Sequence, residues 1–386
     1  MTRCVIEMSW AVATIVRTCT AGTRTWEESM SRVILTLVAF VALLLGPASV
    51  AAAAEGGTGA VYTLTNTAAN AVIVYDRAAS GELTWSGTFP TGGSGGSLGS
   101  QGAVTISEDG RWLYAVDAGS SDIAVFRITK SGLTWSDRVA SGGIQPVSVT
   151  TSHDLVYVVN ATSSNIAGFR SDDGKLSTIA GSAQSFTGTG AAQIQFAPSG
   201  SALVVTEKST SSLDVFVVDK DGVAGAATRY ASSGATPFGF AFGHRGDLVV
   251  SEAAGAAPLS AASSYGLSKD GALTAISRSV PTTQAAACWV AVTKDGRYAF
   301  TANAGSDSIS TFSIDEDGML ALVFAQAAHS TAAHTTDLAL TENSRYLYAN
   351  DGGTHTISAF RVGADGSLVR LPGVTIPAGA SGLAAR

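Results

Sequence analysis

The chain has 386 residues, of which 46% are hydrophobic and only 14% are charged, and 43 are glycine. This composition excludes a disordered polyampholyte and leaves enough length for a large buried core. The formal net charge is −7, and residues 55–386 alone carry 19 Lys and Arg against 27 Asp and Glu, a net charge of −8. Nucleic acid and anionic membranes bind basic faces, so we expect neither as a partner.

Residues 30–54 have the three parts of a secretory signal peptide. Arg32 supplies the positive start, residues 33–45 are apolar, and residues 48–54 offer small-residue cleavage sites. An apolar run of about 13 residues is shorter than the roughly 20 that span a bilayer, although a retained membrane anchor is the alternative interpretation. We therefore expect a secreted or extracytoplasmic protein. Residues 1–29 are then an upstream extension or a mis-assigned start, and residues 55–386 form the mature domain.

Cysteine usage fits one large domain stabilised by packing. Cys4 and Cys19 precede the predicted mature domain, which keeps only Cys288. No internal disulfide can form there, which suits a large β protein better than a small secreted scaffold.

From residue 58 onward, short β-branched and aromatic runs alternate with Gly, Asp, Asn and Ser clusters, and no helical period is sustained. Two kinds of strand recur seven times each. A small-residue strand recurs at 102–106, 147–150, 193–196, 238–242, 289–292, 337–340 and 382–384. An aromatic-rich strand recurs at 61–64, 113–116, 156–159, 203–206, 248–251, 298–301 and 346–349.

Successive copies of the aromatic-rich strand are 43 to 52 residues apart, which is the length of a four-stranded propeller blade. The first copy lacks its leading strand, and a lone leading strand, residues 382–384, remains at the C-terminus. We therefore predict an all-β, seven-bladed β-propeller whose ring closes by pairing of the N- and C-terminal strands, so that no blade edge stays open.

A polar residue follows or ends each aromatic-rich strand. These residues are Asn66, Asp117, Asn160, Glu207, Glu252, Asn303 and Asn350. Asn and Asp side chains bond to neighbouring backbone and start hairpins, which accounts for five of them without any function. Glu does this poorly, so Glu207 and Glu252 are our candidate catalytic carboxylates, with solvation at the rim as the alternative.

Propeller topology brings the ends of these strands and the starts of the small-residue strands to one mouth of the channel. We expect Lys208 there as a catalytic residue. Gln193, Trp289, Asp337 and Cys288 are the candidate substrate-binding residues. Cys288 is better explained as a buried small apolar residue than as a nucleophile, because no His neighbours it in the sequence. His153, His244 and Arg245 fall in turns on the opposite face, where solvated turn residues are the simpler interpretation.

Other motifs give no further site. Residues 92–96 read Gly-Gly-Ser-Gly-Gly and match GxSxG formally, but no helix follows the Gly/Ser-rich loop. His329 and His334 are five residues apart on a connection, with no Cys pair or HExxH nearby, so we expect no metal. No phosphate loop or dinucleotide fingerprint occurs, and we expect no cofactor.

The blades also resemble a known family. Residues 70–75 (Asn-Ala-Val-Ile-Val-Tyr) with 81–83 (Gly-Glu-Leu) are similar to lactonase-type seven-bladed propellers, and the pattern recurs at 121–126 with 132–133 and at 307–312 with 318–320. The resemblance covers about residues 58–386. It implies 6-phosphogluconolactonase or carboxymuconate cyclase chemistry without a required metal.

This chain also departs from the pattern of that family. It implies histidines in the inner strands, where this chain has Ser148, Gln193 and Gly239, whereas Glu252 matches the glutamate that ends a second strand in those enzymes. Glu207 has a related placement one blade earlier.

Two functions are therefore open. The first is an exported lactone hydrolase or lactonising enzyme acting on a small organic acid or sugar lactone, with Glu207 or Glu252 as general base and Lys208 stabilising the oxyanion. The alternative is a noncatalytic exported propeller that binds a small molecule, a glycan or a protein at the same mouth.

Overall fold

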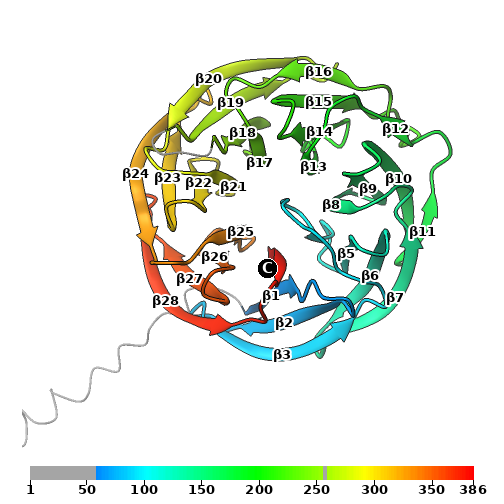
Figure 1. The fold of residues 1–386 in the computed structure, drawn as a ribbon, viewed down its shortest axis with the longest axis horizontal. Coiled ribbons are helices and arrows are strands. Elements are labelled where there is room, and N and C mark those ends of the chain that lie inside the picture. Colours follow the sequence, from blue (N-terminus) through cyan, green and yellow to red (C-terminus); the bar gives the residue numbers. More distant parts are fainter. Residues whose placement is uncertain (1–57, 255–258) are drawn as a thin grey trace, which may run out of the picture. The chain divides into compact units, whose positions relative to one another are not determined.

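The computed structural model of the chain describes residues 58–254 and 259–386, and there every regular element is a β-strand. The strands form seven sheets arranged as blades around one central axis (Figure 1). The prediction of an all-β, seven-bladed propeller is confirmed. The predicted signal peptide and the upstream extension lie outside the described residues. No helix of the described part is long or apolar enough to cross a bilayer.

The first four blades are given from the inner to the outer strand. Blade 1 consists of β29 (Ser381–Ala385), β1 (Gly59–Leu64), β2 (Ala71–Arg77) and β3 (Leu83–Pro90). Blade 2 consists of β4 (Val104–Ile106), β5 (Trp112–Asp117), β6 (Asp122–Thr129) and β7 (Gly132–Ala140). Blade 3 consists of β8 (Pro146–Ser152), β9 (Leu155–Asn160), β10 (Asn165–Asp172) and β11 (Lys175–Thr178), with β12 (Gln184–Ser185) also paired to β10. Blade 4 consists of β13 (Ala191–Phe196), β14 (Ala202–Glu207), β15 (Ser212–Val217) and β16 (Thr228–Ala231).

The remaining three blades follow the same order. Blade 5 consists of β17 (Pro237–Phe242), β18 (Asp247–Glu252), β19 (Ala261–Leu267) and β20 (Leu273–Pro281). Blade 6 consists of β21 (Ala287–Val292), β22 (Tyr298–Asn303), β23 (Ser308–Ile314) and β24 (Leu320–His329). Blade 7 consists of β25 (Thr335–Leu340), β26 (Tyr346–Asp351), β27 (Thr356–Val362) and β28 (Leu368–Thr375).

The two ends of the domain close the ring as predicted. β29 pairs antiparallel with β1, and Tyr62 lies opposite Ala384 and Thr63 opposite Leu383. Blade 1 thus takes its inner strand from the end of the chain and its other three from the start, so this sheet has no unpaired strand edge at the seam.

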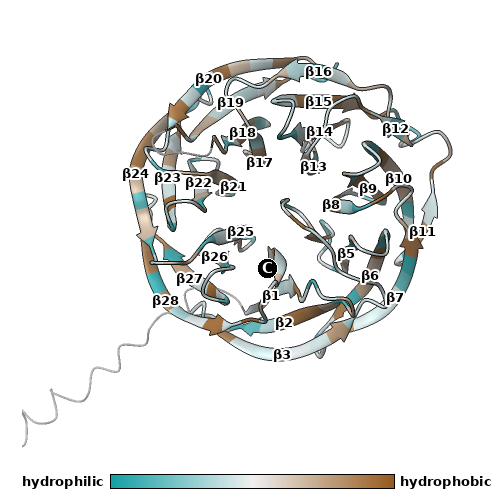
Figure 2. Ribbon diagram, viewed as in Figure 1, coloured by the Kyte–Doolittle hydropathy of each residue, from teal (hydrophilic) through white to brown (hydrophobic). Residues whose placement is uncertain are grey.

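Burial falls from the second strand of a blade to its outer strand. β5, β14, β18 and β26 are buried at all six positions, whereas outer strand β24 alternates between buried or half-buried and exposed positions. Figure 2 shows the outer strands banded in hydrophilic and hydrophobic colours. The second strands are flanked by blades on both faces, so their side chains form the apolar layers between the blades.

The glycine of the recurring outer hairpin packs on the neighbouring blade. A Cβ on Gly174 in blade 3 would lie 2.1 Å from the indole ring of Trp112 in blade 2. In the same way the Gly81 carbonyl of blade 1 accepts a 2.7 Å hydrogen bond from the hydroxyl of Tyr348 in blade 7. Close contact between blades therefore explains why the hairpin glycine recurs beside an aromatic-rich strand.

Candidate functional site

A segment of the chain reaches into one mouth of the channel and contacts several inner strands. Residues 91–102 lie in the connection from β3 to β4, which reaches into the centre of the ring (Figure 1), and we call them the plug segment. The Ser100 hydroxyl donates to the carbonyl of Val147 in blade 3 at 2.8 Å, and the Ser100 carbonyl accepts from the indole N–H of Trp289 in blade 6 at 2.9 Å. The plug segment therefore touches inner strands on both sides of the axis.

Gln101 anchors the end of the plug segment. Its Nε2 donates to the Val290 carbonyl at 2.6 Å, and its Oε1 accepts from the Val290 N–H at 3.0 Å. The amide fills the space beside Gly239, where a Cβ would lie 2.1 Å from Oε1. Gln101 thus binds the inner strand of blade 6 from the position where Gly239 offers no side chain.

Lys208 lies under the plug segment, at the mouth that the topology predicts. Its ammonium donates to the carbonyl of Gly99 at 2.5 Å and lies 4.7 Å from the centre of the Phe238 ring. The Phe238 ring in turn packs against Trp289, with 5.0 Å between the ring centres. Burial lowers the pKa of Lys208 below the usual lysine value, and the neighbouring Cys288 opposes this shift. The Lys208 ammonium therefore lies at the mouth, next to the packed rings of Phe238 and Trp289.

Cys288 is buried beside this cluster as a free thiol. Burial raises its pKa to about 12, although the positive charge of Lys208 acts in the opposite direction. A thiol with this pKa stays protonated near neutral pH, and the thiolate is the nucleophilic form. The geometry thus favours the interpretation of Cys288 as part of the wall of the mouth.

Gln193 lies on the channel wall between blades 4 and 5. Its Nε2 donates to the Phe240 carbonyl at 2.8 Å, and its Oε1 accepts from the Phe240 N–H at 2.7 Å. A channel cavity of about 170 Å³ is lined by Gln193 and by Gln101 of the plug segment. This volume is below the roughly 300 to 1,000 Å³ of ordinary ligand pockets. This cavity, with Gln101 on its wall, is therefore smaller than an ordinary site for a ligand of sugar size.

Asp337 lies on the inner strand of blade 7. It is 1% exposed and accepts the N–H of Leu338 at 2.8 Å. Burial raises the pKa of its carboxyl group well above the usual range. Asp337 makes no hydrogen bond or ion pair with Lys208 among the described residues, so the structure does not bring these two predicted site residues together.

Glu207 lies beneath the linker that enters blade 4. It is fully buried, and a Cβ on Gly188 would overlap its carboxylate. Oε2 accepts from the Ser212 hydroxyl at 2.7 Å and from Arg229 Nη2 at 3.0 Å. Arg229 also pairs with the buried carboxylate of Asp214. Burial raises the pKa of Glu207, whereas the Ser212 and Thr210 hydroxyls act against this shift.

Glu252 has the equivalent position in blade 5, with 1% of its surface exposed. A Cβ on Gly234 of the preceding linker would lie 2.1 Å from its Oε2, and the Ser263 hydroxyl donates to its Oε1. No cation pairs with Glu252 among residues 58–254 and 259–386. Both carboxylates therefore bind to the outer part of their own blade, below a linker, and neither forms an ion pair with Lys208.

The structure thus brings together three of the predicted residues, Lys208, Cys288 and Trp289, and places Gln193 on the channel wall below. Sequence reasoning missed Phe238 and the plug segment. The Gly/Ser-rich composition of residues 92–100 indicates a loop, but no motif in these residues predicts that the loop reaches into the channel. In the described part of the chain no group of three or more His, Cys, Asp or Glu side chains is arranged to hold a metal ion.

The chain matches a protein-family model described as "Lactonase, 7-bladed beta-propeller" over residues 58–184, 174–254 and 253–382. No curated protein gives a significant match.

Solved structures share the fold at low identity. One is a Lactobacillus plantarum protein, with 17% identity, coverage of 86% of this chain and 100% of the other, and a TM-score of 0.70. A Bacteroides fragilis protein provisionally assigned as a 6-phosphogluconolactonase has 17% identity, 88% and 100% coverage and a TM-score of 0.69. A periplasmic gluconolactonase of Pseudomonas aeruginosa has 17% identity, 85% and 99% coverage and a TM-score of 0.68. These likenesses confirm the fold.

Proposed function

Because the chain belongs to the lactonase family of seven-bladed β-propellers, we propose that it is an exported enzyme that opens, or in reverse forms, a small lactone at the mouth of the channel. The observation that carries this proposal is the 2.5 Å hydrogen bond from the Lys208 ammonium to the Gly99 carbonyl. A lactone also presents a carbonyl oxygen. When the plug segment withdraws, the lactone carbonyl takes the place of Gly99 above the Phe238 and Trp289 rings.

Lys208 then supports each stage of hydrolysis. Its ammonium polarises the lactone carbonyl, water adds to the carbonyl carbon, and the ammonium stabilises the oxyanion that forms. The bond from this carbon to the ring oxygen breaks, the ring oxygen takes up a proton, and the hydroxy acid leaves as a carboxylate and a proton. The lowered pKa of Lys208 makes its ammonium a better proton donor to the leaving oxygen than an ordinary lysine.

Glu207 and Glu252 are the two candidates for the general base. Glu207 or Glu252 as the base stays a prediction, and their burial beneath linkers means that water reaches them only if those linkers move. Glu252→Gln and Glu207→Gln test this role. The neutral amide has nearly the same shape as the carboxylate but cannot accept a proton, so turnover should fall in the variant that has lost the general base.

Turnover of unphosphorylated sugar lactones is the direct test. We expect the purified protein to release acid from such a lactone faster than buffer does, and Lys208→Met to reduce kcat about 100-fold, the size expected for one oxyanion donor. Lys208→Arg should retain part of the rate, and Lys220→Met, on an exposed outer turn, serves as the control. The wild-type rate should fall as the pH rises through the pKa of Lys208, since the ammonium form is the active one. Because this pKa is lowered, the fall should begin at a lower pH than for a lysine with the usual pKa. Acid release at the buffer rate across a lactone panel would end this proposal.

Export is a separate part of the proposal. It is supported by the signal-like residues 30–54 and by the fold shared with a periplasmic gluconolactonase. Cell fractionation and the intact mass of the recovered protein test it, and we expect an N-terminus close to residues 49–55. A cytoplasmic protein that retains residues 30–54 would contradict it.

A noncatalytic binding protein is the second candidate. It is favoured by Ser148 and Gln193, which stand where the family resemblance implies histidines, because both bond to the backbone of the next inner strand. A ligand that binds only the folded state raises the melting temperature. Stabilisation by a glycan or small molecule without any turnover supports this candidate over the enzyme.

A further inference from the structure

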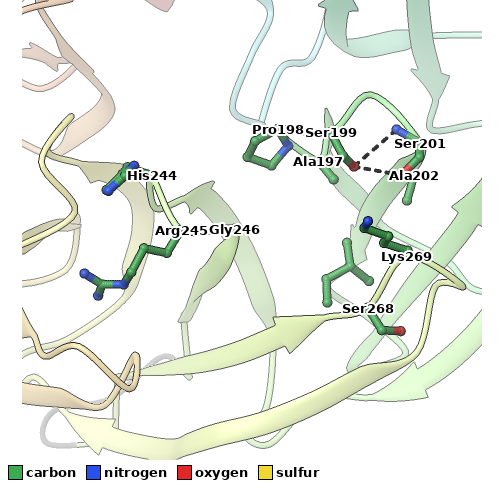
Figure 3. Close-up of a pocket in the computed structure, with 11 residues that line it drawn as sticks. Ala197, Pro198, Ser199, Ser201, Ala202, His244, Arg245, Gly246, Ser268 and Lys269 are labelled. Atoms are coloured by element: carbon green, nitrogen blue, oxygen red, sulfur yellow. Dashed lines mark hydrogen bonds between the residues drawn. The ribbon is translucent and has the colours of Figure 1, made fainter.

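The groove between blades 4 and 5 does not gather its charged side chains around one point. It has a volume of about 330 Å³ and lies at the turns that join the first to the second strands. Figure 3 shows Arg245 and His244 directed away from Lys269, and the Arg245 guanidinium donates to the Asp315 carbonyl of blade 6. An unpartnered buried polar atom lies instead inside the ring, on the inner strand of blade 7.

Two inner strands each hold the next inner strand through one side chain. In blade 3 the Ser148 hydroxyl accepts the Ile194 N–H of blade 4 at 3.1 Å and donates to the Ile194 carbonyl at 3.4 Å. In blade 4 the Gln193 carboxamide accepts the Phe240 N–H of blade 5 at 2.7 Å and donates to its carbonyl at 2.8 Å. Both side chains therefore supply an acceptor and a donor to one residue of the next blade. We call the position that Ser148 and Gln193 share the linking position.

Asp337 occupies the linking position of blade 7. The pairing of first and second strands shifts between Ala191 and Gln193 in blade 4 and between Thr335 and Asp337 in blade 7. Gln193 and Asp337 both lie opposite the residue that precedes the end of the second strand. The next inner strand around the ring is β29, which packs against β25. Asp337 therefore lies at the seam where the two ends of the domain close the ring.

The Asp337 carboxyl group has acceptors in use but one oxygen without a partner. The side chain is 1% exposed, and Oδ1 accepts the Leu338 N–H at 2.8 Å. The N–H of Leu383 in β29 also hydrogen-bonds to the carboxyl group. Oδ2 has no hydrogen-bond partner among the described residues. The corresponding atom of Gln193 is a donor, and a carboxyl group can donate only when it is protonated.

The surroundings of Asp337 supply no compensating charge within the described part of the chain. The titratable groups on or next to the strands that pack against β25 are Cys288, Tyr298, Tyr346, Tyr348, Asp351 and Arg386. Asp351 accepts two hydroxyl groups of its own blade, and Arg386 donates to the Gly110 carbonyl. Burial raises the pKa of the Asp337 carboxyl group well above the usual range. Two N–H groups act against this shift, and no neighbouring charge is among its causes.

We propose that Asp337 is a pH-dependent latch on the ring closure, which holds β29 against blade 7 while the carboxyl group is protonated and releases this seam when it ionises. The protonated group supplies an acceptor and a donor, as the Gln193 carboxamide does. Ionisation removes the donor and leaves a buried charge, which is relieved when β29 separates and water enters. Ser148 and Gln193 do not titrate, so the junctions that they hold lack this dependence. The latch does not depend on the lactone chemistry.

The unfolding equilibrium of the wild type and of Asp337→Asn tests the proposal. Asparagine keeps a donor and an acceptor at every pH. Because the pKa of Asp337 is raised in the folded state, its stabilisation is complete below the pKa of the unfolded chain and is lost as the pH rises towards the folded pKa. The unfolding constant of the wild type relative to Asp337→Asn should therefore rise about tenfold per pH unit between about pH 5 and 7. Urea denaturation at each pH measures this ratio.

Glu342→Gln is the matched control, because Glu342 is an exposed carboxylate of the same blade. Its unfolding constant relative to the wild type should not change over this pH range. Hydrogen exchange then locates the effect. In the wild type the protection factor of residues 381–385 should fall as the pH rises, whereas residues 238–242, which Gln193 holds, should keep theirs. In Asp337→Asn both should stay constant. The proposal is overturned if the ratio of wild type to Asp337→Asn does not change with pH, or if the protection of residues 381–385 follows that of residues 238–242.

Discussion

Two junctions between inner strands on the channel wall are held by the same pair of hydrogen bonds from a glutamine side chain, but the glutamine comes from a different part of the chain in each. Between blades 4 and 5, the carboxamide of Gln193 binds both the N–H and the carbonyl of Phe240. Between blades 5 and 6, the carboxamide of Gln101 binds both groups of Val290. The first glutamine belongs to the adjoining inner strand. The second comes from the plug segment, 189 residues earlier in the chain than its partner.

Gly239 explains the difference. Ala191 and Pro237 lie opposite Glu207 and Glu252 in their blades, and Gln193 and Gly239 each follow two residues later. Gly239 therefore stands where Gln193 stands one blade earlier, but without a side chain. The gap admits Gln101, so the wall of the channel and the closure of its mouth depend on the same contact. Withdrawal of the plug segment leaves Val290 without these two bonds, which links access to the mouth with local stability.

The largest effect is expected from filling the gap. In Gly239→Ala the new Cβ would lie 2.1 Å from Gln101 Oε1, 2.7 Å from the Cys288 carbonyl and 3.0 Å from the Trp289 Cα. Two of these contacts are backbone, so the inner strands must shift, and we expect a loss of about 3 kcal/mol in the free energy of unfolding. Urea denaturation measures it.

A double-mutant cycle identifies the cause of this loss. With Gln101→Ala present, part of the clash is relieved, so the two losses should not add. Strictly additive losses would mean that Gln101 does not occupy the gap.

The second prediction compares the two glutamines directly. Gln193→Ala leaves the buried N–H and carbonyl of Phe240 without these partners, for which we expect about 2 to 3 kcal/mol. Gln101→Ala removes the same two bonds from Val290. The plug segment can then withdraw and admit water, so we expect only about 1 to 2 kcal/mol. Hydrogen exchange of residues 92–102 should increase in Gln101→Ala and not in Gln193→Ala. Equal stability losses with unchanged exchange in both variants would contradict a mobile plug.

Most of the fold could be predicted from the sequence because its signals are local. The β-branched and aromatic runs, the turn residues between them and the seven copies of two kinds of strand predict the blades. The unmatched copies at the two ends of the domain predict the ring closure between β1 and β29. The position of Lys208, Cys288 and Trp289 at one mouth follows from that topology.

The candidate site was less predictable because its contacts join distant residues. Glu207 is a candidate carboxylate in the sequence, but its partner Arg229 is on outer strand β16 and the linker over it is defined only by the packing. The residues next to Gln101 in the sequence do not indicate that Val290 is its hydrogen-bond partner. Glu207 meets its partner through the outer strand of its own blade, and Gln101 meets Val290 across the closed ring. Neither partner is a neighbour in the local sequence.

The smallest effect is expected in the reactivity of Cys288, which reports on the plug segment without altering it. Because burial raises its pKa to about 12, the thiol stays protonated at pH 8, and alkylation of the native protein should be slow. We expect Gln101→Ala to react about ten times faster, since an open mouth hydrates the thiol, and Gln193→Ala to react at the wild-type rate. Peptide mass analysis locates the label. Fast alkylation of the wild type would show that the mouth is already open in solution, and the two junctions would then differ in sequence but not in their control of access.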